Sequence, residues 1–184
     1  MKLPRADISA PALLLWALAV YLSPPGVLWT VLLPVLVHEA GHIAAIRLLG
    51  LKLTGLSIEA GGLEISYRGD REPRRELLIA AAGPLAGFLA AALFPALGER
   101  GRLAAGVSVL LSLFNLLPTR PLDGGRMAEL LLPGISRPLG SVCRAALLAG
   151  GAYLSIKGAG AGLLAAAIFI YIAANAGKAS GTVL

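Results

Sequence analysis

The sequence is poor in cysteine and in charged residues, which supply the disulfides, the cysteine-based metal clusters and the surface charge of many soluble proteins. It contains one cysteine among 184 residues, Cys143, and only 14% of its residues are charged. A single cysteine excludes an internal disulfide and a cysteine-based metal cluster. A soluble domain carries about 25% charged residues, whereas this chain is 57% hydrophobic with a mean hydropathy of +0.81. The composition therefore predicts an integral membrane protein.

Aromatic residues are also scarce, at 5%, and no basic stripe with interleaved aromatic residues is present. We therefore expect no nucleic-acid partner, although the net charge is +6. The basic residues instead fit the rule that positively charged loops stay inside the cell. With the N-terminus inside, every Lys and Arg except Arg100, Arg102 and Lys157 falls on the inner side. Both termini are thus expected to be cytoplasmic.

Apolar segments of helical length predict an all-α polytopic membrane protein, which we expect to form a single domain over residues 1–184. Six spans are expected, several of them shorter than the roughly 20 residues of a full crossing. They cover Ile8–Leu22, Val27–Gly50, Leu77–Leu97, Leu103–Leu117, Ser136–Ile156 and Ala161–Ala176.

Two segments break this helical pattern. In Leu51–Gly69, apolar residues alternate approximately with polar or small ones around Ala60-Gly61-Gly62, which predicts a small membrane-associated β-hairpin between the second and third spans. Thr119–Arg126 is rich in proline and glycine and predicts an irregular turn rather than a regular helix.

The second span carries the clearest chemical signal, His38-Glu39-Ala40-Gly41-His42. A spacing of four residues places both histidines on one helix face, close enough to share a metal ion. In this H-E-x-x-H pattern the glutamate can act as the general base of a zinc protease. The bland alternative is two polar residues at a helix-packing face.

A catalytic zinc ion needs a third protein ligand. Most of the ten acidic residues fall in terminal or loop segments, Glu129 is expected near water, and Glu39 is needed as the base. That leaves Asp123, whose carboxylate would be costly at membrane depth unless it were paired with a cation. The alternative is an Asp-Gly-Gly surface turn.

Together these motifs resemble the site-2 protease family of intramembrane zinc metalloproteases, peptidase family M50. The motifs that carry the resemblance lie within residues 27–126 and are His38–His42, Gly83-Pro84-Leu85-Ala86-Gly87, Asn115-Leu116-Leu117-Pro118 and Pro121–Gly125. The layout is most similar to the sporulation, stage IV FB-like branch, here without its nucleotide-binding CBS domain and without a PDZ insertion.

The resemblance implies Zn²⁺ bound by His38, His42 and Asp123, with Glu39 as the catalytic base. Asn115 would help to hold the substrate or the developing oxyanion, although an interhelical hydrogen bond would explain it equally well. Many relatives have Asn where this chain has Gly87, so no polar role is expected there.

The resemblance further implies a zinc-dependent endopeptidase that cleaves membrane-tethered protein substrates within the lipid bilayer. We expect it in a prokaryotic plasma membrane, with the active site towards the cytoplasm. A second copy of the chain or a regulatory membrane protein is a further expected partner. The alternatives are a catalytically silent membrane adaptor of the same fold and a small transporter, which lacks the support of an inverted repeat.

Overall fold

The structure, a computed structural model, describes residues 5–8, 10, 13, 17, 20–21, 24, 26–59, 62–70 and 72–157. Its internal contacts divide the chain into two units, residues 1–116 and 117–184. The span expected at Ala161–Ala176 lies outside the described residues, as does most of the one expected at Ile8–Leu22. The single-domain organisation stays a prediction.

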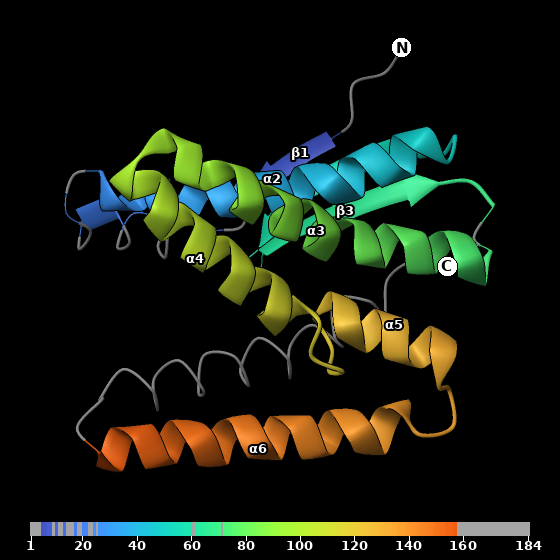
Figure 1. Cartoon of the computed structure of the whole chain (residues 1–184). Coiled ribbons are helices and arrows are strands. Elements are labelled where there is room, and N and C mark those ends of the chain that lie inside the picture. Colours follow the sequence, from blue (N-terminus) through green and yellow to red (C-terminus); the bar gives the residue numbers. More distant parts are fainter. Residues whose placement is uncertain are drawn as a thin grey trace. The chain divides into compact units, whose positions relative to one another are not determined.

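The first unit combines helices with a small sheet (Figure 1). Its helices are α2 (Val27–Leu48), α3 (Pro73–Leu93), the short 3₁₀ helix η1 (Phe94–Leu97) and α4 (Glu99–Asn115). Its strands are β1 (Arg5–Ile8), β2 (Lys52–Glu59) and β3 (Gly62–Arg68). The helices expected from Val27, Leu77 and Leu103 are confirmed, with ends that differ by a few residues.

The predicted hairpin is confirmed. β2 and β3 pair in antiparallel fashion from Lys52 opposite Arg68 to Glu59 opposite Gly62, with an irregularity between Leu53 and Gly55. The sequence did not predict β1, which pairs in parallel with Gly55–Ile58 of β2. Ile8 is therefore the last residue of a strand, and the helix expected from Ile8 does not begin at that residue. The sheet order is β1-β2-β3.

A compact apolar core joins the sheet to two helices. Ile46 of α2, Leu51, Tyr67 of β3 and Ile79 of α3 are buried together. The Tyr67 hydroxyl donates a hydrogen bond of 2.7 Å to Oε2 of Glu76 on α3. Burying four such side chains fixes the helix pair against the sheet.

Glycine allows α2 and α3 to approach closely within the predicted motif. A Cβ atom on Gly41 would lie 2.5 Å from the backbone oxygen of Ala82 and 2.7 Å from Cβ of Ala86. Any larger residue would push the helices apart, because such contacts are shorter than van der Waals distance. The glycine of His38–His42 therefore sets the spacing between the two helices.

The second unit contains α5 (Asp123–Leu131) and α6 (Ser136–Ile156). The helix expected at Ser136–Ile156 is confirmed. The irregular turn expected over Thr119–Arg126 is partly wrong, because Asp123 starts α5. A carboxylate in the first turn favours that helix start, since it interacts well with the positive end of the helix dipole.

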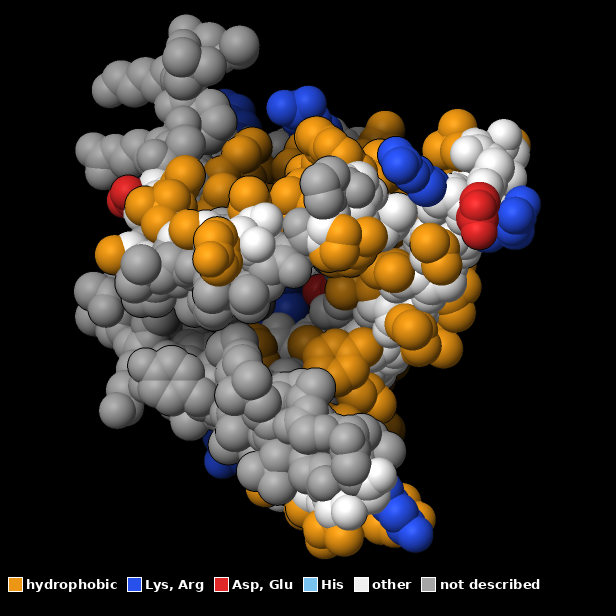
Figure 2. All heavy atoms as spheres, turned by 90° about the vertical axis from the view of Figure 1, so that its left-hand side faces the viewer, with side chains coloured by type: hydrophobic (Ala, Val, Ile, Leu, Met, Phe, Trp, Pro, Cys, Tyr) orange, Lys and Arg blue, Asp and Glu red, His pale blue; other side chains and the backbone are white. Residues whose placement is uncertain are grey.

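Many large apolar side chains are exposed. On one face of α3, Leu85, Leu89 and Leu93 are 64–66% accessible, and hydrophobic side chains are spread over the face seen in Figure 2. A water-soluble chain rarely exposes so many large apolar side chains. Among the described residues, Val27–Leu48 and Pro73–Leu97 are long and apolar enough to cross a membrane. The count of six spans is not confirmed.

Candidate metal centre

α2 brings the two histidines of the chain together inside the first unit. His38 and His42 are both buried, and their rings meet edge to face with centroids 4.9 Å apart. Their Nε2 atoms face each other at 3.2 Å. The helical spacing predicted this pairing, and the structure has it.

The ring of His42 is held by the neighbouring helix. Its Nδ1 lies 2.7 Å from the backbone oxygen of Ile79 on α3. A carbonyl oxygen can only accept, so Nδ1 carries the proton in this bond. In the neutral ring Nε2 is then unprotonated and presents its lone pair, which is the state that a metal ligand requires.

The separation of the two nitrogens fits a shared ion. Zn–N bonds of roughly 2.0–2.1 Å at a tetrahedral angle place two ligand nitrogens about 3.3 Å apart. The observed 3.2 Å agrees with that spacing. The spacing of the histidine pair is therefore compatible with binding of one metal ion.

Gly83 of α3 lines the same site. A Cβ atom at this position would lie 2.8 Å from Nε2 of His38 and closer still to Nε2 of His42. The space in front of both ligand atoms thus depends on a residue without a side chain. An ion between the imidazoles would occupy the region that a methyl group on residue 83 would restrict.

We expect Gly83→Ala to weaken zinc binding by at least about tenfold, because the methyl group would force at least one imidazole to turn away. Zinc content of the purified protein and the midpoint of its thermal unfolding measure the effect. Gly106→Ala is the matched control, since a Cβ on Gly106 of α4 meets nothing within 4 Å. Equal zinc content in both variants would contradict this role of Gly83.

Glu39 and Asn115 also lie in the first unit. Glu39 follows His38 on α2 and is half-buried. Asn115 is the last residue of α4, and its Nδ2 donates to the backbone oxygen of Leu111 in the same helix at 3.0 Å. This bond is local to α4 and does not bridge two helices. The catalytic roles of both residues stay predictions.

The structure explains the glycine at position 87, where relatives were expected to have Asn. A Cβ atom there would clash with Oγ of Ser112, and Ser108 donates a hydrogen bond of 2.8 Å to the Gly87 oxygen. The hydroxyl groups of α4 therefore occupy the space that an asparagine would need.

Asp123 belongs to the second unit, where it is buried at the start of α5. Its position beside the histidines therefore stays a prediction. The donor set of His38, His42 and Asp123, two imidazoles and a carboxylate, is one that zinc prefers.

Sequence reasoning missed two contributors to this centre. The tautomer of His42 is set by the backbone oxygen of Ile79, and the position of a backbone oxygen cannot be read from residue types. Gly83 did carry a signal, since it stands in one of the motifs that support the resemblance, but the motif by itself does not indicate that residue 83 lies against the histidines. Its position four residues after Ile79 places both on neighbouring turns of α3.

The chain matches two models of protein families. Residues 12–121 match the Peptidase M50B-like family, and residues 101–158 match Peptidase family M50. The first match covers more than half of the chain.

Two curated relatives and one solved structure are similar to this chain. A protein named as a zinc metalloprotease, Rip3, of two Mycobacterium tuberculosis strains is 31% identical over 144 residues. That match covers 71% of this chain but 35% of Rip3, so the chain spans about a third of the length of this relative. The site-2 protease of Methanocaldococcus jannaschii superposes with a TM-score of 0.69 at 18% identity, covering 95% of this chain and 92% of that one, which shows a shared fold.

Proposed function

Since this chain belongs to the M50B-like peptidases, the site-2 protease family, we propose that it is a zinc-dependent intramembrane endopeptidase. The observation that carries the proposal is the buried histidine pair, whose Nε2 atoms are 3.2 Å apart with one tautomer fixed by Ile79. A histidine that only packs against a neighbouring helix would not need its Nε2 lone pair directed at the Nε2 atom of a second buried histidine.

In the proposed centre His38, His42 and Asp123 hold Zn²⁺. When bound, the ion supplies Lewis acidity, which makes water more acidic and polarises a peptide carbonyl. The Ile79 oxygen keeps His42 in its binding tautomer, and Gly83 keeps the space before both rings free. Burial of the two imidazoles excludes bulk water from their donor atoms.

Glu39 is the proposed general base. Its carboxylate accepts a proton from the water that attacks the peptide carbonyl, and it then returns that proton to the leaving amine. Asn115, at the end of α4, is proposed to donate a hydrogen bond to the substrate backbone or to the developing oxyanion. To do so its amide would exchange its local bond to Leu111 for one to the substrate.

The substrate of such an enzyme has to unwind. Peptide bonds in a transmembrane helix are engaged in backbone hydrogen bonds, which must open before a carbonyl can be attacked. We propose that the unwound strand pairs with β3. In the sheet as the structure describes it, β1 covers one side of β2, which leaves β3 at the opposite edge. An extended peptide can add to such an edge by backbone hydrogen bonds.

Proline substitutions along β3 test this pairing. Leu63, Glu64, Ile65 and Ser66 follow one another in the strand, and alternate amides point away from β2. Proline removes an amide donor. Proline at residues whose amides point away from β2 should slow cleavage about tenfold and leave the zinc content unchanged. Proline at residues whose amides point towards β2 should instead lower the midpoint of thermal unfolding, because it removes a hydrogen bond within the sheet. Normal cleavage in every folded variant would exclude pairing at β3.

The setting of the reaction is proposed on the same basis. We infer a membrane-tethered protein substrate, a prokaryotic plasma membrane, cytoplasmic termini and an active site towards the cytoplasm. Co-expression with a single-span reporter protein tests the activity. Cleavage within the reporter's span should stop when a chelator removes zinc and should resume when zinc is returned. Cleavage that persists in the metal-free protein would overturn the proposal.

A further inference from the structure

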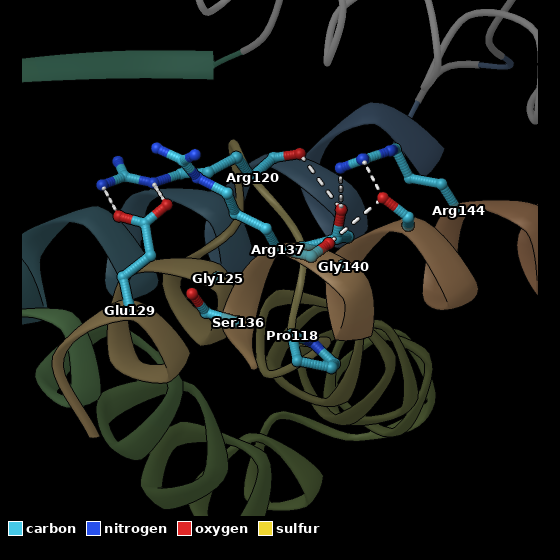
Figure 3. Close-up of a pocket in the computed structure, with 10 residues that line it drawn as sticks. Pro118, Arg120, Gly125, Glu129, Ser136, Arg137, Gly140 and Arg144 are labelled. Atoms are coloured by element: carbon cyan, nitrogen blue, oxygen red, sulfur yellow. Dashed lines mark hydrogen bonds and ion pairs between the residues drawn. The ribbon is translucent and has the colours of Figure 1, made fainter. Parts of the chain in front are cut away.

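The second unit contains a pocket that the proposed protease reaction does not use. It has a volume of about 320 Å³ and lies between the segment before α5, α5 itself and the first turns of α6. Three arginines and one glutamate are its charged lining residues, Arg120, Arg137, Arg144 and Glu129. Figure 3 shows these arginines along one side of the pocket.

One of the three positive charges is neutralised within the pocket. The guanidinium of Arg120 donates from both Nε and Nη2 to the carboxylate of Glu129. This hydrogen bonding holds the pKa of Glu129 below its ordinary value, so the carboxylate stays charged at neutral pH. Arg120 and Glu129 thus form a pair that contributes no net charge.

The positive charges of the other two arginines are not neutralised by a paired carboxylate in the described part of the chain. Arg144 donates to Oγ1 of Thr119 at 3.1 Å and to Oγ of Ser141 at 3.0 Å, and both acceptors are neutral hydroxyls. Within residues 26–157 as described, no carboxylate forms an ion pair with Arg137 or Arg144. The pocket therefore carries a net positive charge, whereas its hydroxyl groups already donate to backbone oxygens.

We propose that this pocket binds the phosphate group of an anionic phospholipid. Guanidinium groups bind phosphate oxygens through paired hydrogen bonds, and Arg137 and Arg144 supply two of them on one helix. Arg144 lies seven positions after Arg137, which places the two about two turns apart on the same side of α6.

The part of α6 that follows Arg144 is apolar and long enough to lie beside the acyl chains of such a lipid. Beyond Arg144 the helix exposes Leu148, Tyr153 and Ile156, and it carries no further charged residue up to its end at Ile156. Arg144 and Ile156 are about 18 Å apart along the axis at 1.5 Å per residue. Half of the hydrocarbon core of a bilayer measures about 15 Å. One helix thus offers a phosphate-binding end and an apolar stretch of acyl-chain length.

Inorganic phosphate shares the headgroup's chemistry, so the test separates the two sources. The full chain in neutral detergent is titrated with phosphatidylglycerol, with phosphatidylcholine or with inorganic phosphate at constant ionic strength. Bound lipid is counted by mass spectrometry of the intact protein, and the thermal midpoint is recorded. We expect phosphatidylglycerol to bind and to raise the midpoint, because a ligand of the folded state stabilises it.

The variants are Arg137→Gln and Arg144→Gln, each expected to weaken phosphatidylglycerol binding about tenfold. Arg102→Gln on α4 removes the same charge outside the pocket and should bind like the unaltered protein. Arg137 is exposed, so its variant should fold even if that of Arg144 does not. Equal losses in all three variants, no preference over phosphatidylcholine, or binding of inorganic phosphate alone would each overturn the lipid site.

Discussion

Replacement of Glu39 by Gln should lower proteolysis about a thousandfold while the protein still binds one zinc ion per chain. The amide has nearly the same size as the carboxylate but cannot accept the proton of the attacking water. General-base catalysis contributes roughly 10²–10⁴ to a rate, and the expected loss lies in the middle of that range. Glu39 is not among the proposed ligands, so the metal should stay.

Glu99→Gln is the matched control for this variant. It makes the same chemical change at an exposed residue in the first turn of α4. Its cleavage of a membrane-tethered reporter should equal that of the unaltered protein. If Glu39→Gln kept most of its activity, Glu39 could not be the base. If the unaltered protein itself cleaved no reporter but bound zinc, the adaptor interpretation would be favoured.

The second large effect is expected on the zinc content of the protein. Asp123→Ala should reduce the zinc content from one ion per chain to well below half, and cleavage should be lost with it. A catalytic zinc ion normally takes three protein ligands, so removing one leaves only the histidine pair. Zinc is measured by mass spectrometry of the purified protein after dialysis against metal-free buffer.

Two further variants separate ligation from folding. Asp70→Ala removes an exposed carboxylate after β3 and should leave zinc and cleavage unchanged. Asp123→Asn keeps the size of the side chain and should retain the thermal midpoint of the metal-free protein while it still loses zinc. Full zinc occupancy in Asp123→Ala would exclude this aspartate as a ligand, and the third ligand would have to be another residue.

The metal motif and the hairpin could be predicted because their signals are local. His38 and His42 are four residues apart, so helix geometry alone brings them together. The alternation in Leu51–Gly69 likewise predicts β2 and β3. β1 could not be predicted in this way, because its partner Gly55–Ile58 lies about 50 residues further along the chain. Its residues also border an apolar run that favoured a helix.

The start of α5 was missed for a different reason. Pro121 and the glycines that follow Asp123 are typical of a turn, and they outweighed the favourable acidic residue in the first helical turn. Gly125 is needed there, because a Cβ atom would lie 2.6 Å from the backbone nitrogen of Arg120. A glycine that serves close packing thus looked like a helix breaker.

The hydrogen bond from His42 to Ile79 means that one proposed metal ligand is oriented by the main chain rather than by a side chain. Substitution of residue 79 by another apolar amino acid would leave that acceptor in place, so an alanine scan would not reveal it. Insertion or deletion of a single residue near the start of α3 would rotate the carbonyl by about 100° around the helix axis. The proposed metal centre should therefore tolerate an apolar substitution at residue 79 but should fail when the length of the chain before it changes.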